Sequence, residues 1–375
     1  ATAKNSLTVG ASENFRNKTL NEWGESYGFP ISDDKKADNI EGIAAFSSRG
    51  PTDDGRIKPD VVAPGTFIAS TNSTLSGDGY YTYMSGTSMA TPIVAGSAAL
   101  VRQYYTETEG LSNPSAALLK ATLINGAHDM APGQYGTGDY REIEGRPDYS
   151  QGWGRIDIEN SLFPQYPDVI AYFDEETIAG TDDFREFDYD YIEEGRPLRA
   201  TLVWTDYPGS TLVIPQLVNN LDLTITSPDD TYYGNYDLNN APDTANNVEG
   251  VEISETVDGD YNVRVDGTHV PEGPQDFSLV LSFTCDNNEF PENGSSTDNS
   301  STIISTDVVH PGGVDQGSIN MMINGSIVVH STEEIPGGYR IYYDKTTPYQ
   351  NGEYDVLVTA QTASGQQFSY GWEFN

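Results

Sequence analysis

The segment from Ser85 to Val101, SGTSMATPIVAGSAALV, constrains the fold of this 375-residue chain more than any other segment. Small residues come first and a helix is expected to follow, with Pro92 in the first helical turn, where proline removes no hydrogen bond. Apolar or small residues then recur every three or four positions: Ala90, Ile93, Val94, Ser97, Ala98 and Val101. This spacing predicts a helix with one buried face.

Ser88 stands at the start of this predicted helix. A hydroxyl at that position lies near unpaired backbone N–H groups and near the positive end of the helix dipole. Such surroundings suit a nucleophile whose attack generates an oxyanion. The same position is also typical of an ordinary N-cap, and most serines at helix starts have no other role. Position alone therefore leaves both interpretations open.

Two longer motifs change that balance. Residues 86–96 read GTSMATPIVAG and residues 46–65 read FSSRGPTDDGRIKPDVVAPG. Both resemble segments of the subtilases, the subtilisin-like serine proteases, in the same order along the chain, and QGWGRIDIENSL at 151–162 resembles the closing segment of the subtilase domain. The resemblance implies that Ser88 is the nucleophile, that its own backbone N–H is one oxyanion donor, and that the Thr87 hydroxyl assists.

A catalytic serine also needs a base and a third group that orients the base. Subtilases carry these in the order Asp, His, Ser, yet neither motif precedes Ser88, and all four histidines follow it: His128, His269, His310 and His330. We interpret each of these histidines as a structural or surface residue. We therefore expect the chain to be the C-terminal part of a longer protease, with the Asp, the His and the oxyanion Asn supplied upstream. Alone, it is expected to be nearly inactive.

Short alternating runs begin at about Asp168. The clearest are LRATLVW at 198–204, LDLTIT at 221–226, YNVRV at 261–265 and FSLVLSF at 277–283, each bounded by turn residues. Such spacing predicts an antiparallel sandwich. The same region resembles the β-barrel domain that follows the catalytic domain in the oxidatively stable alkaline subtilases, which are similar to this chain along residues 1–283. That resemblance implies a barrel stabilised by calcium.

The net charge of −38, from 57 acidic and 19 basic residues, makes nucleic acid an unsuitable partner. It indicates a solvated surface, with calcium bound at some positions. In the resembling family the position of Asp60 can contribute to a weak cation site, with a surface acid as the alternative. Further plausible calcium ligands lie at strand ends, where they can equally cap turns: Asp206, Asn220, Asp222, Asn246, Asn247 and Glu249.

We expect the following domain organisation. Residues 1–166 form the C-terminal part of an α/β subtilisin-like, parallel-sheet domain; residues 167–284 form a β-barrel or jelly-roll domain; residues 285–302 are a polar linker; residues 303–375 form an immunoglobulin-like β-sandwich. The single cysteine, Cys285, excludes an internal disulfide and shows no sign of a reactive thiol. The sequence contains no run of 18 apolar residues, so we predict no membrane-spanning helix.

Two functions remain in competition. The first is a secreted, extracellular serine endopeptidase that acts on proteins and peptides together with its own N-terminal part. The second is a non-catalytic surface protein whose β-domains bind a partner while a subtilase remnant serves as a scaffold. The intact GTSMA string favours the first function. The protease function is also favoured because a fold that begins in mid-sheet leaves strand edges and apolar surface exposed, which the expected N-terminal part of the protease would cover.

Overall fold

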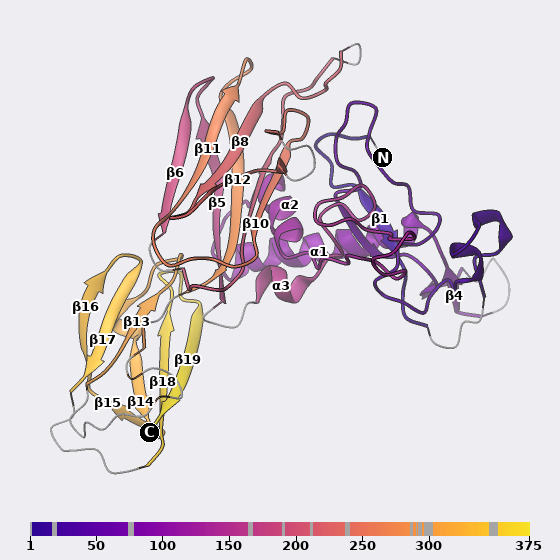
Figure 1. Cartoon of the computed structure of the whole chain (residues 1–375). Helices are drawn as coiled ribbons and strands as arrows, with labels where there is room; N and C mark the ends of the chain where they lie inside the picture. The colour runs from indigo at the N-terminus through magenta and orange to yellow at the C-terminus, as the bar shows by residue number, and fades with distance from the viewer. Residues whose placement is uncertain are drawn as a thin grey trace.

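A computed structural model places three sets of elements along the chain (Figure 1). It describes residues 2–16, 21–73, 79–163, 168–189, 192–210, 213–236, 241–285, 288–289, 291, 295, 303–344 and 352–375. The predicted 285–302 linker therefore lies largely outside the described residues. Of the described helices, none combines the length and the apolar character that a membrane crossing requires.

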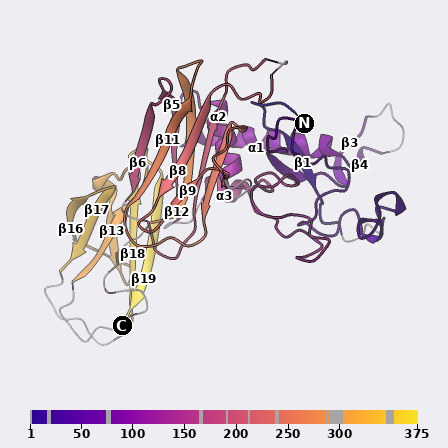
Figure 2. The ribbon, with the colours of Figure 1, turned by 45° about the horizontal axis from the view of Figure 1, so that its top comes forward.

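The first set combines a small parallel sheet with three helices. Its elements are β1 (Val9–Ser12), η1 (Glu25–Tyr27), η2 (Ile31–Asp33), β2 (Val61–Pro64), β3 (Ile68–Thr71), β4 (Tyr81–Met84), α1 (Thr87–Glu107), α2 (Ala116–Asn125) and α3 (Ile158–Leu162). Strands β1 and β2 pair in parallel, with Val9 opposite Val61, whereas β3 and β4 form an antiparallel hairpin. In Figures 1 and 2 this hairpin lies at the opposite end of the molecule from the C-terminal strands.

Helix α1 confirms the helix predicted from Ser85–Val101. Its buried residues are Ala90, Val94, Ser97, Val101 and Tyr105, which follow the predicted spacing. The placement of Pro92 was wrong: α1 begins at Thr87, so the proline is the sixth helical residue. Proline has no N–H to donate four residues back, so the carbonyl of Ser88 loses its helical partner.

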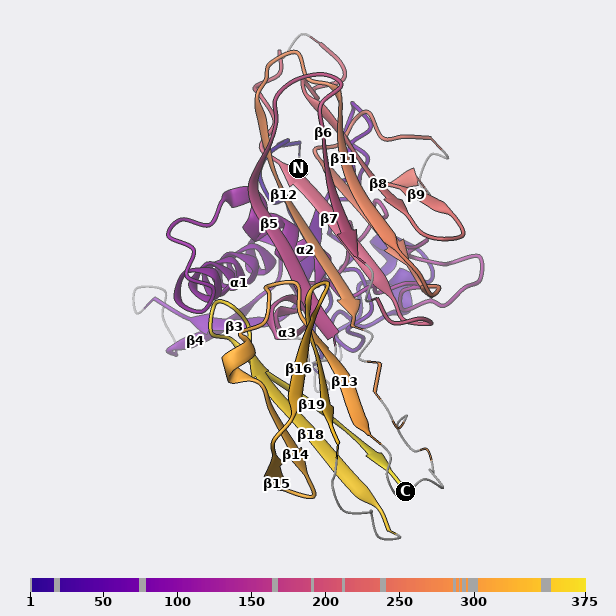
Figure 3. The ribbon, with the colours of Figure 1, turned by 90° about the vertical axis from the view of Figure 1, so that its left-hand side faces the viewer.

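Helix α2 is buried on nearly every side. The hydroxyl of Ser115 caps it by accepting from the backbone N–H of Leu118 at 2.9 Å, and Gly126 ends it. One side of α2 faces α1, and the other packs on the sheet that contains β7 and β12 (Figure 3). A helix that is apolar all round belongs between two layers. This packing joins the first set of elements to the second in one hydrophobic core.

The second set is a two-layer sandwich. Its strands are β5 (Asp168–Ile178), β6 (Phe184–Tyr189), β7 (Leu198–Trp204), β8 (Asn220–Thr226), β9 (Thr231–Tyr233), β10 (Val248–Ile253), β11 (Tyr261–His269) and β12 (Gln275–Thr284). They form two antiparallel four-stranded sheets, ordered β10-β7-β12-β5 and β6-β11-β8-β9. Side chains of both sheets, among them Leu202, Leu223 and Leu279, meet in one core. Cys285 lies fully buried in it.

A closed β-barrel does not form among the described residues of this region, whereas the sandwich predicted from strand spacing does. The jelly-roll topology stays a prediction. Within the described residues no ladder of hydrogen bonds joins the two sheets edge to edge, so they do not close into a barrel. The inward side chains alternate along β8 and β11 with outward ones, as expected when one face of each sheet covers the other.

The third set is a second, smaller sandwich. It comprises β13 (Ile304–Val309), η4 (Gln316–Ser318), β14 (Asn320–Ile323), β15 (Ser326–Val328), β16 (Ser331–Ile335), β17 (Gly338–Tyr343), β18 (Tyr354–Gln361) and β19 (Gln367–Phe374). The sheets are ordered β13-β17-β16 and β15-β14-β18-β19. They enclose a core around Met321, Ile341, Val356 and Trp372. Two packed antiparallel sheets agree with the expected sandwich, and its immunoglobulin-like character stays a prediction.

Candidate active site

Ser88 lies in the first turn of α1 and its side chain is exposed. Gly86 immediately precedes the helix with φ of +154°, a conformation that favours glycine. The backbone N–H of Met89 donates to the carbonyl of Gly86 at 2.9 Å, which closes the turn around the serine. The serine is therefore held at a helix start, where free N–H groups and the helix dipole favour negative charge.

The two subtilase-like motifs meet beside this turn. The N–H of Gly86 donates to the carbonyl of Gly65 at 2.8 Å, and the N–H of Phe67 donates to the Ser85 hydroxyl at 2.9 Å. Gly65 must be glycine, because a Cβ there would lie 2.5 Å from the Cβ of Ala11 on β1. The end of β2 thus braces the start of α1 through backbone contacts, which fixes the position of Ser88.

Thr87 is half-buried, and its carbonyl accepts from the hydroxyl of Thr91 at 2.9 Å. It also lines a cavity of about 220 Å³ beneath the turn, together with Gly10, Arg49 and Lys58. Within the described residues, no hydrogen bond reaches the Ser88 hydroxyl from a histidine. His128 instead lies 3.3 Å from Glu41, and the other three histidines lie in the two sandwiches.

Asp60 sits among lysines. Its fully buried carboxylate lies 2.8 Å from the Nζ of Lys58 and 2.9 Å from that of Lys120, and it accepts from the N–H and hydroxyl of Thr8 at 2.6 and 2.7 Å. Burial raises the pKa of Asp60, but the charges of Lys120 and Lys58 outweigh it and hold the pKa below its usual range. These ammonium groups take the contacts that the predicted cation would need.

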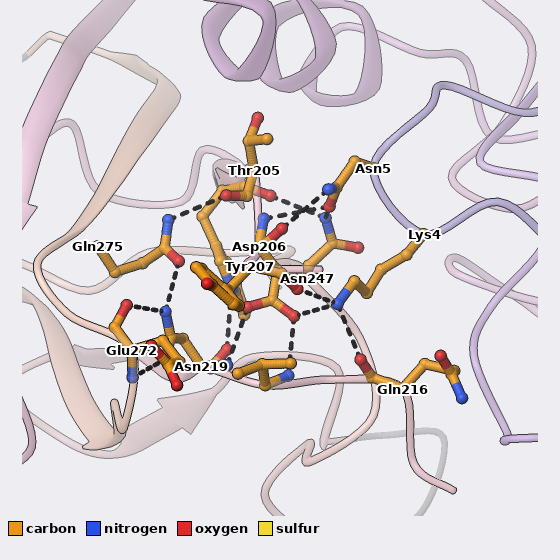
Figure 4. A network of polar contacts seen from close by, with 12 residues as sticks. Lys4, Asn5, Thr205, Asp206, Tyr207, Gln216, Asn219, Asn247, Glu272 and Gln275 are labelled. Atoms are coloured by element: carbon orange, nitrogen blue, oxygen red, sulfur yellow. Dashed lines mark hydrogen bonds and ion pairs between the residues drawn. The ribbon is translucent and has the colours of Figure 1, made fainter. Parts of the chain in front are cut away.

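Asp206 and Asn247 lie together at the junction between the N-terminal segment and the first sandwich (Figure 4). The Nζ of Lys4 lies 2.6 Å from Oδ2 of Asp206, which also accepts from the N–H of Val218 at 2.8 Å, while Oδ1 accepts from the N–H of Asn219 at 2.8 Å. Asn247 donates to Asn5 at 3.1 Å. As at Asp60, a lysine side chain, here Lys4, supplies the positive charge beside the predicted calcium ligand Asp206.

The remaining predicted calcium ligands gather near β8 and β10. Asn220 donates to Asp222 at 2.8 Å, and Asn246 donates to Asp243 at 2.7 Å. Glu249 accepts from the N–H of Leu223 at 2.7 Å through Oε2. Its other oxygen, Oε1, is buried and has no hydrogen-bond partner among the described residues, and the same holds for Oδ1 of Asn220. Two buried oxygens thus lack a donor in a region of carboxylates.

The electrostatics of this third group differ from those of the other two. Burial, followed by repulsion from Asp243 and Asp222, raises the pKa of Glu249 well above its ordinary value. Burial raises the pKa of Asp222 to about 6. In the part of the chain that the structure describes, no lysine or arginine forms an ion pair with these carboxylates as Lys4 does with Asp206. Across the described residues, however, no three His, Cys, Asp or Glu side chains are already arranged around a metal position.

Sequence reasoning missed the partners Lys4, Lys58, Lys120 and Asp243. One signal was available: Lys120 interrupts the apolar run of α2, and a lysine inside a buried helix requires a counter-charge. Lys58 also lies two residues from Asp60 within the RIKPD string. The pairing of Lys4 with Asp206 had no local signal.

Comparison with known proteins finds a family for the N-terminal part of the chain, which includes Ser88. Residues 1–154 match the family Peptidase_S8, described as the subtilase family. The chain is 33% identical over 310 residues to the serine protease/ABC transporter B family protein tagB of Dictyostelium discoideum, a match that covers 65% of this chain and 16% of that protein. It is 44% identical over 112 residues to the serine protease AprX of Bacillus subtilis, covering 26% of this chain and 23% of AprX.

The chain thus spans less than a quarter of the length of either relative. A solved structure, CopC from Methylosinus trichosporium OB3b, covers 23% of this chain and 86% of its own at 18% identity, and its TM-score of 0.20 carries no argument. The matches support a peptidase as the class of protein. More particularly, they support the subtilase family for residues 1–154.

Proposed function

We propose that this chain is part of a subtilase that hydrolyses peptide bonds in proteins, with Ser88 as the nucleophile. The observation that carries the proposal is the exposed Ser88 hydroxyl in the first turn of α1, braced by Gly65. Attack by Ser88 on a peptide carbonyl would form an acyl-enzyme and release the amine, and water would then release the acid. The Ser88 N–H would donate to the oxyanion, and the Thr87 hydroxyl would assist.

The base, the group that orients it and the second oxyanion donor would come from an upstream segment of the same protease. The surface of α1 supports this part of the proposal. Small and apolar residues are exposed along the helix: Thr91, Pro92, Ala95, Gly96, Ala99 and Leu100. The parallel sheet beside it has just the two strands β1 and β2 among the described residues. An upstream segment that extends this sheet and covers α1 would bury that apolar surface.

We further propose that calcium stabilises the protein near β8 and β10. The unpartnered buried oxygens of Asn220 and Glu249, beside Asp222 and Asp243, are the kind of donors that calcium prefers. Lysines already compensate Asp60 and Asp206, which leaves this region as the best-supported one. We also infer an extracellular location and closest similarity to the oxidatively stable alkaline group, both implied by the sequence resemblance.

A fluorophosphonate probe tests the nucleophile directly. We expect no labelling of this chain alone, and labelling of Ser88 once the upstream segment of its gene is co-expressed with it. The Ser88→Ala variant should abolish that labelling, whereas Ser70→Ala, which alters an exposed serine on β3, should retain it. Absence of the triad partners should lower turnover by roughly 10⁴- to 10⁶-fold.

Two results would contradict the proposal. Labelling that persists in the Ser88→Ala variant would exclude Ser88 as the nucleophile. A reassembled protein that folds, as judged by circular dichroism, yet remains unlabelled would instead favour the non-catalytic surface protein.

A further inference from the structure

A cavity far from Ser88 lies where the three sets of elements meet. It has a volume of about 220 Å³. Its walls come from the end of α1, from α3, from β5 and from two loops of the smaller, C-terminal sandwich that contains β13–β19. Figures 1 and 3 show that sandwich next to α3 and the adjoining end of β5. At about 30 Å³ per water molecule, the cavity has room for the end of one long side chain.

Tyrosine rings form the wall on the α1 side. Tyr105 and Tyr172 meet edge to face, with centroids 4.8 Å apart and planes at 69°, and Tyr104 packs on Tyr105 at 5.7 Å. Tyr105 is anchored from behind, because its hydroxyl is 2.8 Å from the hydroxyl of Thr122 on α2. The rings therefore present fixed aromatic surface to the cavity, which is attractive to a cation.

Glu109, just beyond the end of α1, places a carboxylate among these rings. Its Oε2 accepts from the hydroxyl of Tyr172 at 3.2 Å. Its Oε1 is buried and accepts no hydrogen bond of normal length from the described residues, although the hydroxyl of Tyr104 lies near the same carboxylate. Burial, and then the neighbouring charge of Glu109, raise the pKa of Tyr104 and of Tyr172, so both hydroxyls stay protonated. Within the described residues, Oε1 can thus receive a donor from the cavity, beside the hydroxyl of Tyr104.

Among the described residues that line the cavity, none carries a positive charge that could pair with the carboxylate of Glu109. Among the described residues that line it, Glu109 alone is charged at neutral pH, since the other residues are apolar, hydroxyl-bearing or amide-bearing apart from His310. Burial lowers the pKa of His310 to about 4, so its imidazole is neutral. Glu109 as a residue is half-buried, and a carboxylate oxygen shielded from water, as its Oε1 is, is stabilised when a donor reaches it.

We propose that this cavity binds an alkylguanidinium or alkylammonium cation, such as an arginine or lysine side chain or a polyamine. The cation would donate to Oε1 of Glu109 and lie against the rings of Tyr104 and Tyr172. The 21 residues of α1 separate the cavity from Ser88 by about 30 Å at 1.5 Å per residue. The site is therefore distinct from the proposed catalytic one, and it does not depend on the proposed function.

Isothermal titration of this chain with Nα-acetyl-arginine amide tests the proposal, with the uncharged citrulline analogue as the matched ligand. We expect saturable 1:1 binding of the arginine compound and none of the citrulline compound. Glu109→Gln should weaken binding at least tenfold. The matched control is Glu107→Gln, which removes the same charge from an exposed position two residues away, and it should change binding less than twofold.

Two further titrations identify the source of the cation. Spermidine represents a free polyamine, and an acetylated Ala-Ala-Arg-Ala amide represents a polypeptide. The ligand that binds with the higher affinity identifies the source of the cation. Should Glu109→Gln fail to fold, Glu109→Asp keeps the charge while shortening its reach, and it should still weaken binding severalfold. The proposal is overturned if the native chain binds arginine and citrulline compounds alike, or if Glu107→Gln weakens binding as much as Glu109→Gln.

Discussion

The Nζ atom of Lys4 lies 2.6 Å from Oδ2 of Asp206, although 202 residues separate them along the chain. The Asp206 carboxylate is completely buried, and the Lys4 side chain is 11% exposed. This pair, with the neighbouring contacts of Asn5, ties the N-terminal segment to the first sandwich. Asp60 has an equivalent arrangement with Lys58 and Lys120. Buried carboxylates at both places are thus compensated by lysine.

Replacement of Lys4 by methionine should destabilise the protein. Asp206 would keep its backbone N–H donors but lose its buried counter-charge, and breaking such a pair lowers the free energy of unfolding by about 3–5 kcal/mol. Urea denaturation measures the change. Arg102→Met, which removes an exposed cation from α1, is the control and should have little effect. An equal effect of both variants would show that the Lys4 contact is not special.

Replacement of Asp60 by asparagine should be harmful near neutral pH and less so at alkaline pH. It would leave Lys58 and Lys120 buried without their carboxylate. Burial already lowers the pKa of Lys58 to about 8 in the native chain, and loss of the carboxylate would lower that pKa further. The unfolded state then binds more protons, and stability rises with pH in that window. We expect the stability gap to the native chain to narrow as the pH rises toward 8, the pKa of Lys58 in the native chain. A gap independent of pH would contradict this account.

The carboxylates near β8 and β10 predict a linked response to pH and calcium. Since the pKa values of Glu249 and Asp222 are raised on folding, the folded state keeps protons that the unfolded state loses above about pH 4. In a chelator, thermal stability should therefore fall as pH rises through 6. Calcium at 100 times its Kd should restore about 2.7 kcal/mol.

Glu249→Gln should remove most of that pH dependence and of the calcium response. Glu255→Gln, an exposed change just after β10, serves as the control and should alter neither. Calcium stabilisation that survives Glu249→Gln unchanged would place the ion elsewhere.

Two glycine substitutions should act in opposite directions. Gly65→Ala would bring a Cβ to 2.5 Å from that of Ala11 and to 3.0 Å from the Gly86 carbonyl, so it should destabilise the chain by about 1–3 kcal/mol. Gly96 lies within α1 and a Cβ there meets nothing within 4 Å, so Gly96→Ala should stabilise by up to about 1 kcal/mol. Thermal melting of this chain distinguishes the two, and a stable Gly65→Ala variant would refute the bracing of Ser88.

Local features of the fold could be predicted from the sequence. The three-and-four spacing after Ser88 predicted the buried face of α1. The run at 198–204 coincides with β7. These features follow from periodicity and turn chemistry, which neighbouring residues determine.

Longer-range features could not be predicted. Whether two sheets close into a barrel depends on how their edge strands meet, and the outer sheet face of β7 and β12 is covered by α2 rather than by solvent. The partners of Asp60 and Asp206 also depend on packing, since Lys120 and Lys4 come from distant parts of the chain. The catalytic role of Ser88 remains a prediction.

The lysines beside Asp60 and Asp206 have a consequence for the supply of positive charge. A metal ion must be captured from the surroundings and can be lost by dilution or displaced by a competitor. An ammonium group is synthesised with the chain in fixed stoichiometry and stays covalently attached to it. At Asp60 and Asp206 lysines of the chain itself consequently supply positive charge, in fixed proportion to the carboxylates they contact.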